Sequence, residues 1–130
     1  VLLLAHEQIG DAFAALVRHF FQNIPDFTAI VGVQPDEDLA AVRARIDAAL
    51  AALPPHSGVL ALADIFGATP FNAAHISVSP DFVLVSGLNV PMAVKAVQYA
   101  PLAENLADLA EAVRAAGVKG IIEAEPAVQG

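Results

Sequence analysis

Short, continuous apolar runs alternate along this chain with segments whose apolar residues recur at helical spacing. The apolar runs lie within residues 1–5, 27–33, 59–64 and 82–86, and residues 118–123 form a last predicted strand. Helices are predicted at 9–22, 39–53, from Pro70, at 91–99 and at 102–113, the last ended by Gly117. Strands that are apolar at every position are typical of a parallel sheet covered on both faces. The alternation therefore predicts a three-layer α/β fold: a mainly parallel central sheet of four strands plus a C-terminal edge strand, with helices on both faces.

Length and composition favour one globular unit. A chain of 130 residues suits a single domain, and no shift in composition divides it. Because 57% of the residues are hydrophobic and 15% are charged, disorder is excluded for most of the chain. No apolar run approaches the roughly 20 residues of a membrane-spanning helix. We expect one domain over residues 1–125, followed by a loose tail at 126–130.

Charge and residue types exclude several functional classes. Six basic residues stand against 14 acidic ones, which gives a net charge of −8 and disfavours nucleic acids and anionic membrane surfaces as partners. The chain has no cysteine, so disulfides and thiolate metal sites are excluded, and a cytoplasmic location is expected. No two histidines have the i, i+4 spacing of a helical metal site. We therefore expect neither a metal nor another cofactor.

Polar residues follow the ends of three predicted strands. They lie in the segments 6–8, 64–72 and 86–92. In a parallel sheet these segments share one edge, where ligands bind in a crevice. His6 and Asp64 could lie side by side there, and a carboxylate that holds a neutral imidazole makes it a nucleophile with a defined tautomer.

The segment 64–72 also has features of an anion site. Gly67 permits a tight turn, and Thr69 is placed to cap a helix that begins at Pro70. Backbone N–H groups at such a helix start attract a phosphoryl group. Each residue also has an ordinary structural interpretation: Asp64 as a turn cap, Thr69 as a helix cap, and Asn72 and Asn89 as partners of loop backbone.

Two motifs make the chain resemble a known family. Asp64-Ile65-Phe66-Gly67-Ala68-Thr69-Pro70-Phe71-Asn72-Ala73-Ala74 and Ser86-Gly87-Leu88-Asn89-Val90-Pro91-Met92, together with the strand that ends in His6, resemble the enzyme IIA domain of the mannose family of bacterial sugar phosphotransferase systems. The similarity extends over nearly the whole chain. It implies a phosphocarrier that accepts a phosphoryl group on His6 from the histidine-containing phosphocarrier protein and passes it to a separate enzyme IIB. It also implies a homodimer, which in some members exchanges a C-terminal strand.

The resemblance assigns roles to individual residues. His6 and Asp64 would be catalytic, with Asp64 hydrogen-bonded to one ring nitrogen so that the other can attack. Phosphoryl oxygens would be bound at Gly67, Ala68 and Thr69. The supporting loop residues would be Phe66, Asn72, Asn89 and Pro91.

The chain departs from the family pattern beside the histidine. The family has Thr-His-Gly where this chain has Ala5-His6-Glu7, and Gly-Gly-Ser-Pro where it has Gly67-Ala68-Thr69-Pro70. The second change keeps a hydroxyl, whereas Glu7 would repel a phosphoryl group unless it points away. Two alternatives therefore stay open: a non-catalytic regulatory or binding module of the same fold, and a receiver-like domain phosphorylated on Asp64.

Overall fold

Four parallel strands form a single sheet in the computed structural model, which describes residues 1–128. The strands are β1 (Leu2–His6), β2 (Ala29–Val33), β3 (Val59–Ala63) and β4 (Phe82–Ser86). Their order in the sheet is β2-β1-β3-β4. The four predicted parallel strands are confirmed.

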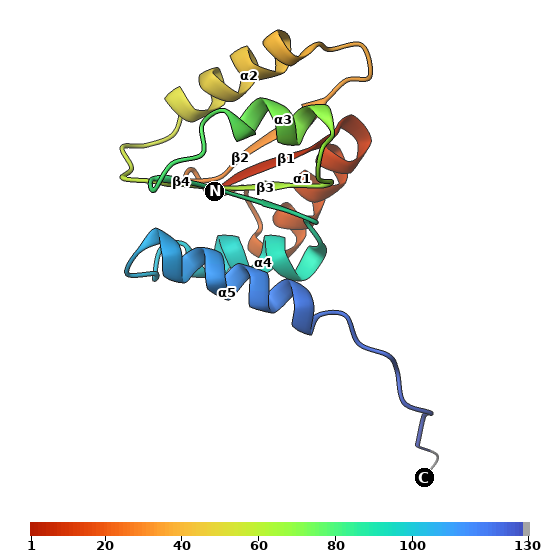
Figure 1. Cartoon of the computed structure of the whole chain (residues 1–130). Helices are drawn as coiled ribbons and strands as arrows, with labels where there is room; N and C mark the ends of the chain where they lie inside the picture. The colour runs from red at the N-terminus through yellow and green to blue at the C-terminus, as the bar shows by residue number, and fades with distance from the viewer. Residues whose placement is uncertain (129–130) are drawn as a thin grey trace.

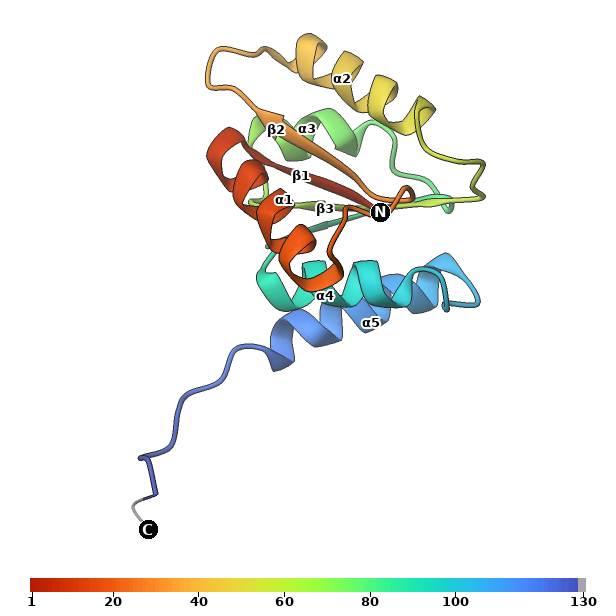
Figure 2. The same cartoon turned by 180° about the vertical axis from the view of Figure 1, so that it is seen from behind.

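Helices cover both faces of this sheet, as predicted. They are α1 (Glu7–Phe21), α2 (Leu39–Ala51), α3 (Thr69–His75), α4 (Val90–Tyr99) and α5 (Leu106–Lys119). Figure 1 shows α2 and α3 above the sheet and α4 and α5 below it, and Figure 2 shows α1 on the side of α4. Within residues 1–128, no helix is long and apolar enough to cross a membrane.

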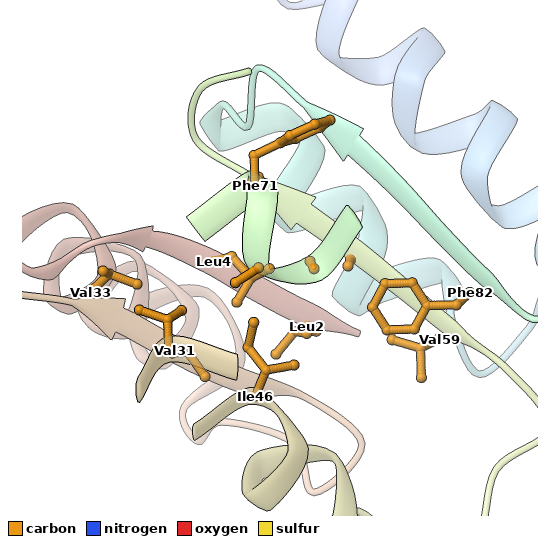
Figure 3. Close-up of a cluster of buried hydrophobic side chains, with 13 residues drawn as sticks. Leu2, Leu4, Val31, Val33, Ile46, Val59, Phe71 and Phe82 are labelled. Atoms are coloured by element: carbon orange, nitrogen blue, oxygen red, sulfur yellow. The ribbon is translucent and has the colours of Figure 1, made fainter. Parts of the chain in front are cut away.

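The hydrophobic core lies in two layers, one on each face of the sheet. Because successive strand side chains point to opposite faces, Leu2 and Leu4 of β1 pack with Ile46 of α2, whereas Leu3 packs with Phe13 of α1. All three leucines are fully buried. Figure 3 shows the first of these layers, in which strand and helix side chains interdigitate. Burial on both faces explains why the strands are apolar at nearly every position.

The strand order places a topological switch point at the ends of β1 and β3. From β1 the chain crosses to β2 on one side, and from β3 it crosses to β4 on the other. Helices consequently diverge at this point, which is where ligands bind in open parallel sheets. The ladder continues one step beyond β3, since the backbone N–H of Asp64 donates to Leu4 O at 3.0 Å.

The predicted C-terminal edge strand is wrong. α5 continues through Gly117 to Lys119, and residues 121–128 form no helix or strand but lead away from the sheet (Figure 1). Gly117 is buried because α5 packs closely on α4: a Cβ there would lie 2.6 Å from Met92 Cγ. The glycine is thus a packing residue and not a helix stop. Of the predicted tail 126–130, residues 129 and 130 lie outside the described residues.

Candidate functional site

His6 and Asp64 are directly hydrogen-bonded at the carboxyl end of the sheet. His6 Nδ1 lies 2.7 Å from Asp64 Oδ2, and the backbone N–H of His6 donates to the same oxygen at 2.9 Å. The other carboxylate oxygen, Oδ1, accepts the backbone N–H of Ile65 at 2.9 Å. The sequence-based pairing of these two residues across neighbouring strands is therefore present.

The exposure of the two side chains differs sharply. The Asp64 side chain is 9% exposed, whereas the His6 side chain is 49% exposed. Since an ionised carboxylate only accepts hydrogen bonds, the proton of a neutral His6 ring lies on Nδ1. The lone pair is then on Nε2. The pair consequently presents one oriented nucleophilic nitrogen and a carboxylate that can stabilise positive charge on the ring.

β1 passes into α1 without an intervening loop. His6 is both the last strand residue and the N-cap of α1, with φ −58° and ψ 149°, and Glu7 is the first helical residue. The helix starts two residues earlier than its apolar stripe predicted. Because the N–H groups of a first turn have no intrahelical partner and carry the positive end of the helix dipole, they favour negative charge near His6.

The loop between β3 and α3 has a left-handed turn and backbone N–H groups without protein partners in residues 1–128. Gly67 has a left-handed φ of +81°, and the Asn72 amide donates to Gly67 O at 2.9 Å. The backbone N–H of Asn72 also donates to Ala68 O. Within residues 1–128, no protein acceptor meets the N–H of Gly67 or Ala68. Asn72 thus binds the carbonyl groups of Gly67 and Ala68, whereas the N–H groups of these two residues have no partner in residues 1–128.

Thr69 is not the helix cap that its position suggested. α3 begins at Thr69 itself, so Ala68 occupies the N-cap, and Pro70 follows in the first turn. The Thr69 hydroxyl has no hydrogen-bond partner in the described part of the chain. It is consequently available to a ligand at this loop.

Asn89 and Pro91 connect two helices. Asn89 caps α4 by accepting the Met92 N–H at 3.0 Å, and its amide donates to Gly117 O at 3.1 Å. A Cβ at Gly120 would lie 2.4 Å from Pro91 Cγ, so α5 ends directly against this proline. No hydrogen bond joins Asn89 to His6 or Asp64 in residues 1–128. Its position fits the ordinary structural interpretation, as a cap and as a tie between α4 and α5.

Apolar side chains follow Asp64 on the surface. Phe66 is 72% exposed, and Ile65 beside it is also exposed. The Phe66 ring contacts that of Phe71, with ring centres 4.7 Å apart, and Phe71, which belongs to α3, is buried. The exposed Phe66 ring is therefore packed on a buried one.

A polar network on the other side of His6 was missed by the sequence analysis. The Gln34 side-chain amide donates to Glu7 Oε1 at 2.5 Å, and the Gln34 backbone N–H donates to Glu37 Oε1 at 2.8 Å. Arg45 Nη1 binds the same Glu37 oxygen at 2.5 Å and Gly32 O at 2.7 Å. The backbone N–H of Gln34 and, second, Arg45 lower the pKa of Glu37. This network could have been anticipated only from the pairing of β1 with β2, in which Val33, just before Gln34, lies opposite His6.

The two networks border an open pocket. It has a volume of about 370 Å³ and is lined by His6, Glu7, Gln8, Ile9, Val33 and Pro35. Among the described residues, no three potential metal ligands lie together. The site thus combines an exposed imidazole with a helix start.

Comparisons with known proteins identify relatives of this arrangement. The family model EIIA-man, described as the PTS system fructose IIA component, matches residues 1–114. No curated protein sequence matches the chain. Among solved structures, the mannose/sorbose-specific IIA subunit of the phosphotransferase system from Enterococcus faecalis is 24% identical, with a TM-score of 0.82 over 99% of this chain and 96% of that one. The phosphotransferase component EIIA from Streptococcus agalactiae is 21% identical, with a TM-score of 0.81 over 94% of each chain. At these identities the structures establish a shared fold.

Proposed function

This chain belongs to the EIIA-man family, the mannose-type IIA components of the sugar phosphotransferase system, and on that premise we propose that it is a phosphocarrier whose phosphoryl group resides on His6. The observation that carries the proposal is the His6–Asp64 hydrogen bond, combined with a half-exposed ring. A buried carboxylate orients the imidazole, and solvent reaches the ring. An exposed ring nitrogen suits a protein that both accepts and transfers a phosphoryl group.

The chemistry follows from the tautomer. The Nε2 lone pair of His6 attacks phosphorus on a phosphohistidine of the donor, the new N–P bond forms, and the donor N–P bond breaks with its electrons returning to the donor ring. The Nδ1 proton stays between His6 and Asp64. Because the phosphorylated His6 ring becomes cationic, the Asp64 carboxylate stabilises it at 2.7 Å.

The phosphoryl oxygens would be received by groups that lack protein partners. Such groups are the N–H groups of Gly67 and Ala68 on the β3–α3 loop and the hydroxyl of Thr69 at the start of α3. The first turn of α1 adds its dipole, worth about 0.3–1 kcal/mol for an exposed anion. Modest stabilisation of this kind suits a carrier, since tight binding would slow release. Phe66 and Asn72 would support this loop.

The two alternatives are less well supported. A receiver-like domain would need Asp64 as the acceptor, but its carboxylate already accepts two backbone N–H groups and faces the His6 ring. A non-catalytic module was favoured by Glu7, but the Glu7 side chain is hydrogen-bonded to Gln34. The exposed His6 ring favours the carrier.

The partners follow from the family and from two surfaces. We propose the histidine-containing phosphocarrier protein as donor and a separate cytoplasmic enzyme IIB as acceptor, docking over Phe66. We also propose a homodimer in which residues after α5 pair with β4 of a second copy. Ile121 and Ile122 are each 79% exposed, and no strand of residues 1–128 covers the outer edge of β4.

The proposal is tested by phosphoryl transfer from phosphoenolpyruvate through enzyme I and the phosphocarrier protein. The wild-type chain should become labelled with ³²P, and His6→Ala should not. The label should be lost in acid and kept in base, as for phosphohistidine, whereas an acyl phosphate on Asp64 would be lost in base. Failure to label with any cognate carrier protein would contradict the proposed function.

A further inference from the structure

One carboxylate, that of Asp64, binds the His6 ring, and a second belongs to the next residue in the chain, Glu7, whose hydrogen-bond partner lies on the other side of β1. Asp64 comes from the β3 side and binds Nδ1. Glu7 follows His6 in the chain, but its carboxylate accepts a hydrogen bond from Gln34, which follows β2. A phosphoryl group on Nε2 carries nearly two negative charges at neutral pH, so the place of the Glu7 carboxylate affects how easily that group arrives.

The position of Gln34 is itself fixed by a second set of hydrogen bonds. Its backbone N–H donates to Glu37, and Glu37 is bound by Arg45, which also reaches Gly32 O of the same strand. The guanidinium of Arg45 is thereby held at the β2 corner. Gly32 completes this corner, since a Cβ there would lie 3.2 Å from Glu7 Cα. The start of α1 consequently rests directly on β2, within reach of Gln34.

We infer that Gln34 is a positioning residue: it holds the Glu7 carboxylate over the end of β2 and away from the approach to His6 Nε2. The inference rests on the proposed carrier function and explains how the histidine can work beside a glutamate. Within residues 1–128, Gln34 makes no hydrogen bond to the His6 ring. Its effect therefore passes entirely through Glu7, which makes the inference separable from a purely structural role.

The test uses phosphoramidate, a small donor that needs no partner protein. Nε2 attacks its phosphorus, the P–N bond breaks, and ammonia leaves with the bonding electrons. The first variant is Gln34→Met, which keeps the length of the side chain but removes the amide donor. It should phosphorylate His6 about two- to fivefold more slowly than the wild type, as expected for one partly exposed charge. Gln34→Lys, whose ammonium can still bind Glu7, should keep at least the wild-type rate.

A double variant distinguishes a positioning role of Gln34, acting through Glu7, from a purely structural role. In Glu7→Gln/Gln34→Met, the slow-down should disappear, because no charge remains to be held away. Raising the salt concentration should likewise narrow the difference between Gln34→Met and wild type but leave the double variant unaffected. Circular dichroism verifies that each variant is folded.

Three results would overturn the inference: an unchanged rate in Gln34→Met, an equal slow-down in the double variant, or no labelling of wild-type His6 by phosphoramidate. Labelling by phosphoramidate without labelling by the phosphocarrier protein would instead count against the proposed function alone. The two failures are thus distinguishable.

Discussion

Nδ1 of His6 lies 2.7 Å from Oδ2 of Asp64, and the two residues come from neighbouring strands 58 positions apart in the chain. The carboxylate also accepts the backbone N–H groups of His6 and Ile65. Its orientation is thus set by backbone, and the ring orientation is set by the carboxylate. Because the ring is held in this way, His6 presents only Nε2 to solvent although its side chain is half-exposed.

Asp64→Asn tests the orienting role of the carboxylate. An amide that turns its NH₂ group toward His6 favours the wrong tautomer, and it gives no charge to stabilise a phosphorylated ring. We expect the rate of His6 phosphorylation to fall at least about tenfold. The initial rate of ³²P incorporation measures this, with the exposed Asp26→Asn as a matched control that should stay at the wild-type rate.

Asn89→Ala tests whether the third loop contributes to binding or to structure. The change removes the α4 cap and the bond to Gly117 O, so the free energy of unfolding should fall by about 1–2 kcal/mol. Asn105→Ala, which removes the exposed α5 cap, should cost less because that side chain makes no bond to another helix. Urea unfolding compares the two. Loss of labelling in folded Asn89→Ala would contradict the structural role.

Gly117→Ala tests the close approach of α5 and α4. The new methyl group would meet Met92 Cγ at 2.6 Å and Sδ at 2.9 Å, so overpacking should cost about 1–3 kcal/mol. Thermal or urea unfolding measures this cost. In Gly117→Ala/Met92→Ala the combined loss should be smaller than the sum of the two single losses, because the collision is relieved. Strict additivity would contradict the packing explanation.

The Glu37 carboxyl gives a pH prediction. The Gln34 N–H and Arg45 lower its pKa below the usual 4.5 in the folded protein, so its contribution to stability is present above that value. The contribution is lost as the pH falls through the lowered folded-state pKa. Arg45→Met should move the pKa of Glu37 back toward 4.5, measured by NMR titration of its side-chain carboxyl carbon. An unchanged pKa would mean that Arg45 does not act on Glu37 in solution.

The strands were predictable because their signal is local. Each is five residues of nearly unbroken apolar sequence, and burial on both sheet faces leaves little choice of fold. The start of α2 also has a local cause, since Asp38 caps it by accepting the Ala41 N–H at 2.8 Å. The pairing of His6 with Asp64 followed from the rule that parallel strands end at one edge.

The remaining features depend on contacts between distant segments. Gly117 next to Val118, Ile121 and Ile122 has the pattern of a helix stop and a strand, and only the packing of Met92 on Gly117 explains why the helix continues. The Gln34–Glu7 bond requires the register between β1 and β2. The spacing of residues in the sequence reveals neither the packing of Met92 on Gly117 nor the bond between Gln34 and Glu7.

The position of the phosphoryl group on the His6 ring depends directly on the hydrogen bond to Asp64. NMR of the phosphorylated protein with ¹⁵N-labelled histidine distinguishes substitution at Nε2 from substitution at Nδ1. Because Asp64 holds Nδ1 at 2.7 Å, we predict a phosphoryl group on Nε2 of His6, with a proton retained on Nδ1. A phosphoryl group on Nδ1, on another histidine or on Asp64 would contradict the account.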